Sequence, residues 1–187
     1  MITNTFDPSP VAKLNPFVNP DAVRVDVKPA FSAARKGEDG YYDGIPFEEG
    51  KKLDFTRVFG NSNPVVMEIG FGDGTATWQM AERNPSVNII AVDVYPPGVG
   101  ALLNMVHEKG LSNVRVMNHD ACEILENMID DSSLAGFHIF FPDPWPKKKH
   151  NKRRLINSSF ASFMVRKLKA GGYVYTVTDW ADYAEQM

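Results

Sequence analysis

The stretch Glu68-Ile69-Gly70-Phe71-Gly72-Asp73-Gly74 closes a short apolar run, Val65–Ile69, and precedes a helix candidate, Thr75–Arg83. Glycines at alternate positions let the backbone turn sharply and let a ligand approach it closely. The helix that follows offers unpaired N–H groups and partial positive charge at its first turn. A strand, a glycine turn and a helix in this order predict the first unit of a ligand-binding α/β fold.

Apolar runs and helix candidates alternate from this stretch to the end of the chain. The expected strands cover 65–69, 88–92, 114–117, part of 134–141, and 173–177; the expected helices cover 75–83, 99–109, 121–128 and 155–168, with another beginning at 180. This alternation predicts an α/β fold, a doubly wound and mostly parallel sheet with helices on both faces.

The first third of the chain has a different character. Five prolines between Pro8 and Pro29 interrupt any helix there, so residues 1–62 are expected to form a partly irregular N-terminal arm. Residues 63–187 contain the whole alternating pattern and form the expected second unit. A hydrophobic content of 43% is enough for a packed core.

The spacing of the glycines favours S-adenosylmethionine over a nicotinamide dinucleotide. The dinucleotide pattern needs a third glycine where this chain has Thr75. S-adenosylmethionine has an amino-acid end that needs backbone donors and a carboxylate. We expect Gly70, Gly72 and Gly74 to bring the backbone close to that end, and Glu68 to supply the carboxylate.

Two further carboxylates follow the next two expected strands. Asp93 lies 23 residues after Gly70, at the place where this architecture binds both ribose hydroxyls. Asp120 follows the third strand and precedes a helix directly. Its side chain could contact the exocyclic amine of adenine, or it could only cap that helix.

The loop Asp143-Pro144-Trp145-Pro146 follows the fourth expected strand. Its two prolines stiffen it by fixing φ. Trp145 offers a flat face on which a base could stack, or it packs against the sheet. A stiff loop with an acid and an aromatic ring beside a methyl donor fits a nucleobase substrate. It also resembles the Asp/Asn-Pro-Pro-aromatic loop of amino-methylating enzymes.

A basic run begins directly after this loop. Six of the eight residues from Lys147 to Arg154 are Lys or Arg, and the other 14 basic residues of the chain face 23 acidic ones. A cluster of cations in an otherwise acidic chain predicts contact with the backbone of RNA or DNA.

Five segments together resemble one family: Glu68–Gly74, Pro97–Gly100, Asn118–Asp120, Phe140–Leu155, and Thr178–Trp180 with Tyr183–Glu185. The stretch from about Leu53 to Met187 resembles the bacterial tRNA (guanine-N7-)-methyltransferases, which are class I, Rossmann-like and S-adenosylmethionine-dependent. The long segment from Phe140 to Leu155 is highly specific for them. The glycine turn is shared by many methyltransferases.

The resemblance implies a role for each matching residue. Glu68, Asp93 and Asp120 would bind S-adenosylmethionine, and Asp143 would be the catalytic acid. Lys147 and Asp179 would hold the target nucleoside. The tRNA would be contacted by Lys149, His150, Asn151, Lys152, Arg153 and Arg154. The chain departs from the family pattern at Asp93, where Glu is usual, and at Asp73, where Met is common.

The family continues beyond the last helix expected here, with an antiparallel hairpin and a Thr-x-x-Glu substrate motif. We therefore expect the chain to be truncated at its C-terminus and to lack that hairpin. The expected activity is transfer of a methyl group to N7 of a guanosine in the variable loop of tRNA. The alternatives are a non-catalytic RNA-binding subunit with this fold and an amino-methyltransferase acting on adenine or cytosine.

Composition limits the remaining possibilities. No apolar run approaches the ~20 residues of a membrane helix, and the N-terminus shows no signal peptide. Cys122 is the only cysteine, which fits a reducing cytoplasm. The four histidines show no metal-ligand spacing, so no metal site is expected. A monomer and a homodimer both stay open.

Overall fold

The computed structural model describes residues 44–187. Most of the predicted N-terminal arm, residues 1–43, lies outside the described residues. Within the described residues, no helix combines the length and the apolar character needed to cross a bilayer.

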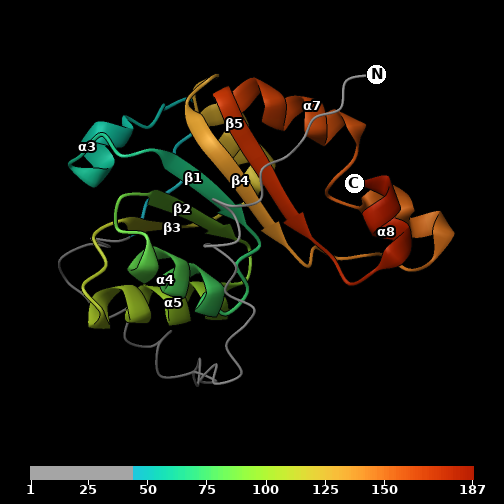
Figure 1. Ribbon diagram of the computed structural model, residues 1–187, viewed down its shortest axis with the longest axis horizontal. Coiled ribbons are helices and arrows are strands. Elements are labelled where there is room, and N and C mark those ends of the chain that lie inside the picture. Colours follow the sequence, from blue (N-terminus) through green and yellow to red (C-terminus); the bar gives the residue numbers. More distant parts are fainter. Residues whose placement is uncertain (1–43) are drawn as a thin grey trace.

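Five strands form one sheet in the order β3-β2-β1-β4-β5, and every neighbouring pair is parallel (Figure 1). Their bounds are β1 Val65–Ile69, β2 Asn88–Asp93, β3 Val114–Asn118, β4 Leu134–Phe140 and β5 Leu168–Val177. The chain proceeds from β1 outward to β2 and β3 on one side, and then returns to place β4 and β5 on the other side of β1. The strand order therefore reverses between β1 and β4. Ligands of open α/β sheets bind at this switch point, outside the carboxyl ends of the strands.

Helices cover both faces of the sheet. Their bounds are α3 Phe55–Phe59, α4 Thr75–Arg83, α5 Pro96–Glu108, α6 Ala121–Asn127, α7 Ser158–Lys167 and α8 Ala181–Gln186, with a 3₁₀ helix, η2, at Lys148–Arg153. Successive residues of β2 enter opposite cores, because side chains alternate along a strand. Ile90 and Val92 pack with α6 and α7, whereas Ile89 and Ala91 pack with α4 and α5. The predicted doubly wound α/β fold is confirmed.

Local sequence explains where the helices begin. Gly74 precedes α4 with a φ of 77°, and Asp73 accepts a hydrogen bond from the N–H of Thr75 at 2.9 Å. Asn157 caps α7 by accepting from the N–H of Phe160 at 3.1 Å. Helix α4 therefore has the bounds that the sequence predicts.

The predicted helix over 155–168 is too long at both ends, and the strand predicted at 173–177 is too short. Helix α7 begins only after its Asn157 cap, and Leu168 is already extended, with a ψ of 140°. Leu168 pairs with Leu134 of β4, so strand pairing ends the helix. Gly171, with a φ of 79°, lies where the register of this pairing shifts.

The described part of the predicted arm packs against the sheet unit. Ile45 donates to the carbonyl of Val116 at 2.9 Å, which adds a short parallel bridge outside β3. Leu53 donates to the carbonyl of Met128 at 2.8 Å, and Phe47 and Leu53 pack against the core around α6. The division of the chain at residue 62 stays a prediction.

Gly98 in α5 provides a test of how closely this helix packs on the glycine turn. A Cβ at Gly98 would lie 1.8 Å from the carbonyl oxygen of Gly72. Alanine normally stabilises a helix by up to about 1 kcal/mol relative to glycine. We expect Gly98→Ala to destabilise the protein instead, by roughly 1–3 kcal/mol, because the turn must move.

Urea unfolding followed by circular dichroism measures this change. His107→Ala, at an exposed position in the last turn of the same helix, is the control and should stay within about 0.5 kcal/mol of the parent. A Gly98→Ala protein as stable as the parent would show that the turn tolerates displacement.

Candidate active site at the carboxyl edge of the sheet

The turn after β1 needs glycine at three positions because the backbone has a positive φ at each of them. Gly70, Gly72 and Gly74 have φ values of 75°, 63° and 77°, a region that other residues rarely adopt. Phe71 is buried and anchors the turn, and its carbonyl accepts from the N–H of Gly74 at 3.0 Å. The turn thus holds its backbone at the carboxyl edge of the sheet, at the start of α4.

Asp93, at the end of β2, links the glycine turn to the segment that follows β2. One carboxylate oxygen accepts from the N–H of Gly72 at 2.8 Å, and the other accepts from the N–H of Tyr95 at 2.9 Å. Asn118 of β3 donates to the carbonyl of Asp93 at 2.8 Å. A carboxylate has about four acceptor positions, so Asp93 can hold the turns and still accept from two ribose hydroxyls.

Glu68 lies beneath the turn, in the last part of β1. Its side chain is 1% exposed, and within the described part of the chain its Oε2 has no hydrogen-bond partner. Burial raises the pKa of its carboxyl to about 7, the Thr77 hydroxyl lowers it, and the charge of Asp93 adds to the rise. Such an unpartnered acceptor fits the ammonium end of S-adenosylmethionine, which carries donors only.

Asp120 caps α6, as one of its two predicted roles requires. It accepts from the N–H groups of Cys122 and Glu123 at 2.8 and 3.2 Å. The side chain is exposed at the end of β3, so a contact with adenine stays a prediction. Next to it, His119 stacks on Phe47 with ring centroids 3.8 Å apart.

Two exposed apolar side chains beside the ribose-binding position were missed by sequence reasoning. Val94 and Tyr95 directly follow Asp93, and they are 67% and 57% exposed. The sequence does contain a signal for these two residues, because they directly follow an acid at the end of a predicted strand. They offer a surface for a purine ring next to the acid that would bind its ribose.

The loop after β4 has a strained backbone. Phe141 and Trp145 have φ values of 49° and 45°, which cost about 1–3 kcal/mol each for residues other than glycine. Asp143 lies between them and is exposed. The Arg153 guanidinium lies 4.9 Å from the Trp145 ring centroid. That ring thus packs against the basic segment, a contact that neither of its two predicted roles, base stacking and packing on the sheet, includes.

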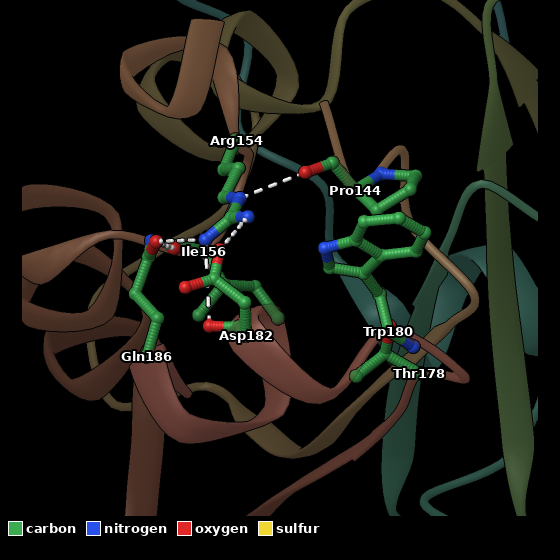
Figure 2. A network of polar contacts seen from close by, with 7 residues as sticks. All are labelled: Pro144, Arg154, Ile156, Thr178, Trp180, Asp182 and Gln186. Carbon is green, nitrogen blue, oxygen red and sulfur yellow. Dashed lines mark hydrogen bonds and ion pairs between the residues drawn. The ribbon is translucent and has the colours of Figure 1, made fainter. Parts of the chain in front are cut away.

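The basic run divides into two groups. Lys147, Lys148, Lys149, Lys152 and Arg153 are exposed on and around η2, whereas His150 and Asn151 are half-buried. His150 meets the Trp145 ring edge-on at 6.0 Å, and the Asn151 amide lies 3.1 Å from the carbonyl oxygen of Trp145. The Arg154 side chain is only 1% exposed and is held by Pro144, Asp182 and Gln186 (Figure 2).

Asp179 follows β5, the strand next to β4, and is exposed. Thr178 accepts from the N–H of Trp180 at 3.2 Å just before α8 begins. Because β4 and β5 are parallel neighbours, Asp143 and Asp179 emerge at the same edge as the glycine turn. In residues 44–187, no group of three His, Cys, Asp or Glu side chains is arranged to hold a metal.

The fold and this row of strand-end acids around a glycine turn define a Rossmann-like methyltransferase. Among solved structures, the chain resembles an antibiotic-related methyltransferase (TM-score 0.52, 18% identity, 73% of this chain and 70% of that one). It also resembles a 30S ribosomal A1408 methyltransferase from an uncultured bacterium (TM-score 0.52, 15% identity, 73% and 67%). At these identities the likeness concerns the fold alone.

Residues 62–187 match a family model described as "Putative methyltransferase". The chain is 48% identical over 157 residues to a tRNA (guanine-N(7)-)-methyltransferase of Neisseria meningitidis serogroup B, covering 83% of this chain and 66% of that protein. It is 54% identical over 135 residues to one of Yersinia enterocolitica, covering 72% and 56%. The chain belongs to the methyltransferase family that includes these enzymes, which confirms the resemblance. It spans about two thirds of their length or less.

The buried carboxyl of Glu68 predicts a specific dependence of stability on pH. Its pKa rises from 4.5 to about 7 on folding, so between these values the folded state binds more protons than the unfolded chain. Stability therefore falls as pH rises through this window. Glu68→Gln removes this contribution, and its stability relative to the parent should increase by on the order of 2–3 kcal/mol between pH 5 and 8.

Urea unfolding at several pH values measures the two slopes. Glu108→Gln, at an exposed position of α5, controls for the loss of one negative charge and should leave the slope unchanged. Parallel curves for the parent and Glu68→Gln would mean that Glu68 titrates as an ordinary surface carboxyl.

Proposed function

We propose that this protein transfers a methyl group from S-adenosylmethionine to N7 of a guanosine in the variable loop of tRNA. The observation that carries the proposal is a juxtaposition at one sheet edge. The glycine turn with Asp93, the loop of Asp143 and the exposed cations of η2 all follow parallel strands. The names of the relatives support the same activity, and a tRNA substrate implies a cytoplasmic enzyme.

The cofactor site follows from the chemistry of the residues around the switch point. S-adenosylmethionine, when bound, supplies the methyl group on a sulfonium. Glu68 and the turn of Gly70, Gly72 and Gly74 receive its amino-acid end. Asp93 accepts from the ribose hydroxyls, and Asp120 with the apolar surface beside Asp93 receives the adenine.

The residues at β4 and β5 serve a nucleophile that needs no deprotonation. N7 of guanine carries a lone pair and no proton, and it can attack a methyl group in line. Asp143 stabilises the positive charge that develops on the purine, or it accepts with Asp179 from the Watson–Crick edge and orients the ring. Lys147 lies beside this loop and holds the target nucleoside. Positioning supplies most of the rate gain.

The exposed cations select a polynucleotide and restrict where its target can be. N7 faces the major groove, which is deep and narrow in A-form RNA. The target guanosine must therefore lie in a loop or leave its stack. The lysines at 149 and 152 and Arg153 are exposed beside Asp143 in the chain and meet the tRNA backbone, together with His150 and Asn151.

The direct test is methyl incorporation into unmodified bulk tRNA, followed by analysis of the methylated nucleosides. The Neisseria meningitidis relative serves as the positive control. 7-Methylguanosine supports the proposal, whereas methylated adenine or cytosine would indicate an amino-methyltransferase. A non-catalytic subunit would bind tRNA but would transfer no methyl group, and calorimetry would detect no heat of S-adenosylmethionine binding.

Asp143→Asn tests the catalytic carboxylate. The change keeps the shape of the side chain and removes the charge that stabilises the purine, so kcat should fall by roughly 100-fold or more. The Kd for S-adenosylmethionine should stay within about twofold, because Asp143 follows β4 and not the glycine turn. Single-turnover kinetics and calorimetry measure the two values. Equal losses in both would contradict the role of Asp143.

Replacing Lys148, Lys149 and Arg153 together by Ala tests the tRNA surface. Binding weakens with salt, so the slope of log K against log salt is negative. Each lost phosphate contact reduces the magnitude of this slope by about 0.7–0.9. The triple variant should therefore weaken tRNA binding and flatten its salt dependence by up to about 2–3. The control removes the same charge at exposed positions elsewhere, namely Arg57, Arg83 and Arg166. An identical slope in both variants would place the docking surface elsewhere.

A further inference from the structure

Arg154 is the last residue of the basic run, and its environment differs from that of the others. Its side chain is 1% exposed, whereas Lys152 and Arg153 face solvent. A phosphate group cannot reach a guanidinium that the protein already encloses. The positive charge and the hydrogen-bond donors that made Arg154 a candidate for tRNA contact thus face groups of the protein itself.

The guanidinium uses donors on all three of its nitrogens within the protein. Nε donates to the carbonyl of Pro144 at 2.8 Å. One terminal nitrogen donates to Oε1 of Gln186 at 2.8 Å and to the carbonyl of Asp182 at 3.5 Å, and the other pairs with the Asp182 carboxylate at 2.5 Å. Figure 2 shows the group between Pro144 on one side and the side chains of α8 on the other.

These partners belong to two segments that are distant in the sequence. Pro144 directly follows Asp143 in the loop after β4. Asp182 and Gln186 belong to α8, which begins two residues after Asp179. Arg154 therefore bridges the two segments that carry the acids proposed to face the guanine.

Further contacts fasten α8 to the chain around Arg154. The guanidinium lies 4.8 Å from the centroid of the Tyr183 ring, and Tyr183 is fully buried. The hydroxyl of Tyr183 accepts from the N–H of Ile156 at 2.9 Å, and Gln186 donates to the carbonyl of Ile156 at 2.7 Å. These contacts link a short helix of six residues to the chain around Arg154.

The geometry requires arginine and not only a positive charge. A planar guanidinium presents donors in fixed directions, so it can bind a carbonyl on one side and a carboxylate and an amide on the other. The ammonium group of lysine is a point charge and cannot span three such acceptors. A Lys at this position keeps the charge and loses the bridge.

We propose that Arg154 is a positioning residue, which fixes the Asp143 loop relative to α8 and Asp179, and that it does not contact tRNA. The role of the two acids rests on the proposed function. The physical link between the two segments does not. A displacement of about 1 Å at a reacting centre can cost on the order of 100-fold in rate, so such a link matters for turnover.

Arg154→Lys separates positioning from charge. We expect kcat for methyl transfer to fall by roughly 10-fold or more, while the Kd for tRNA and its salt slope stay at the parent values. Arg83→Lys, at an exposed position of α4, is the matched control and should leave kcat unchanged. Gln186→Ala breaks the same bridge from the side of α8 and should lower kcat in the same direction. A kcat within twofold of the parent for Arg154→Lys would overturn the proposal.

Amide hydrogen exchange tests the link without any assumption about activity. Arg154→Lys should speed exchange roughly 10-fold both in 181–187 and in 144–150, because one bridge holds both segments. Faster exchange in only one segment, or in neither, would refute the link. If the parent methylates no tRNA, the proposed function fails, and hydrogen exchange still decides whether the link exists.

The salt dependence of tRNA binding tests the alternative that Arg154 contacts phosphate. Arg153→Ala should lower the slope by about 0.7–0.9, and Gln186→Ala and Arg154→Ala should leave it unchanged. A drop in slope for Arg154→Ala equal to that for Arg153→Ala would assign Arg154 to the tRNA surface and overturn the proposal.

Discussion

The parallel pairing of the five strands is the constraint on which the candidate site depends. Because every strand runs in the same direction, each one releases its following loop at the same edge of the sheet. The glycine turn, Asp93, Asp120, Asp143 and Asp179 are spread over more than a hundred residues of sequence. They lie along one edge only because β3, β2, β1, β4 and β5 pair as parallel neighbours.

The site concentrates features that would be unfavourable elsewhere in the fold. Glu68 is a buried carboxyl with one oxygen that has no partner among residues 44–187, and Phe141 and Trp145 adopt left-handed backbone conformations. Arg154 is a buried cation whose partner Asp182 lies at the surface. Two apolar cores on opposite faces of the sheet stabilise the fold and offset these local costs. Such features are typical of residues that bind or orient ligands.

Much of the architecture could be predicted because short-range signals determine it. The glycines at 70, 72 and 74 fix the turn, and the alternation of apolar runs with helix candidates fixes the fold class. The start of β5 could not be predicted. Local signals place the end of the helix at Leu168 and the strand only after the glycines at 171 and 172, whereas pairing of Leu168 with Leu134 begins the strand directly after the helix. Strand pairing is a long-range interaction, and it overrides propensity where the two conflict.

The sequence by itself determined the chemical groups: the glycine turn, the strand-end acids and the density of positive charge from Lys147 to Arg154. Only the tertiary structure decided what these groups face. Arg153 and Arg154 are neighbours of the same residue type, yet one covers the Trp145 ring and the other lies between Pro144 and α8. Burial depends on which distant segments pack around a side chain, and residue type alone does not specify that.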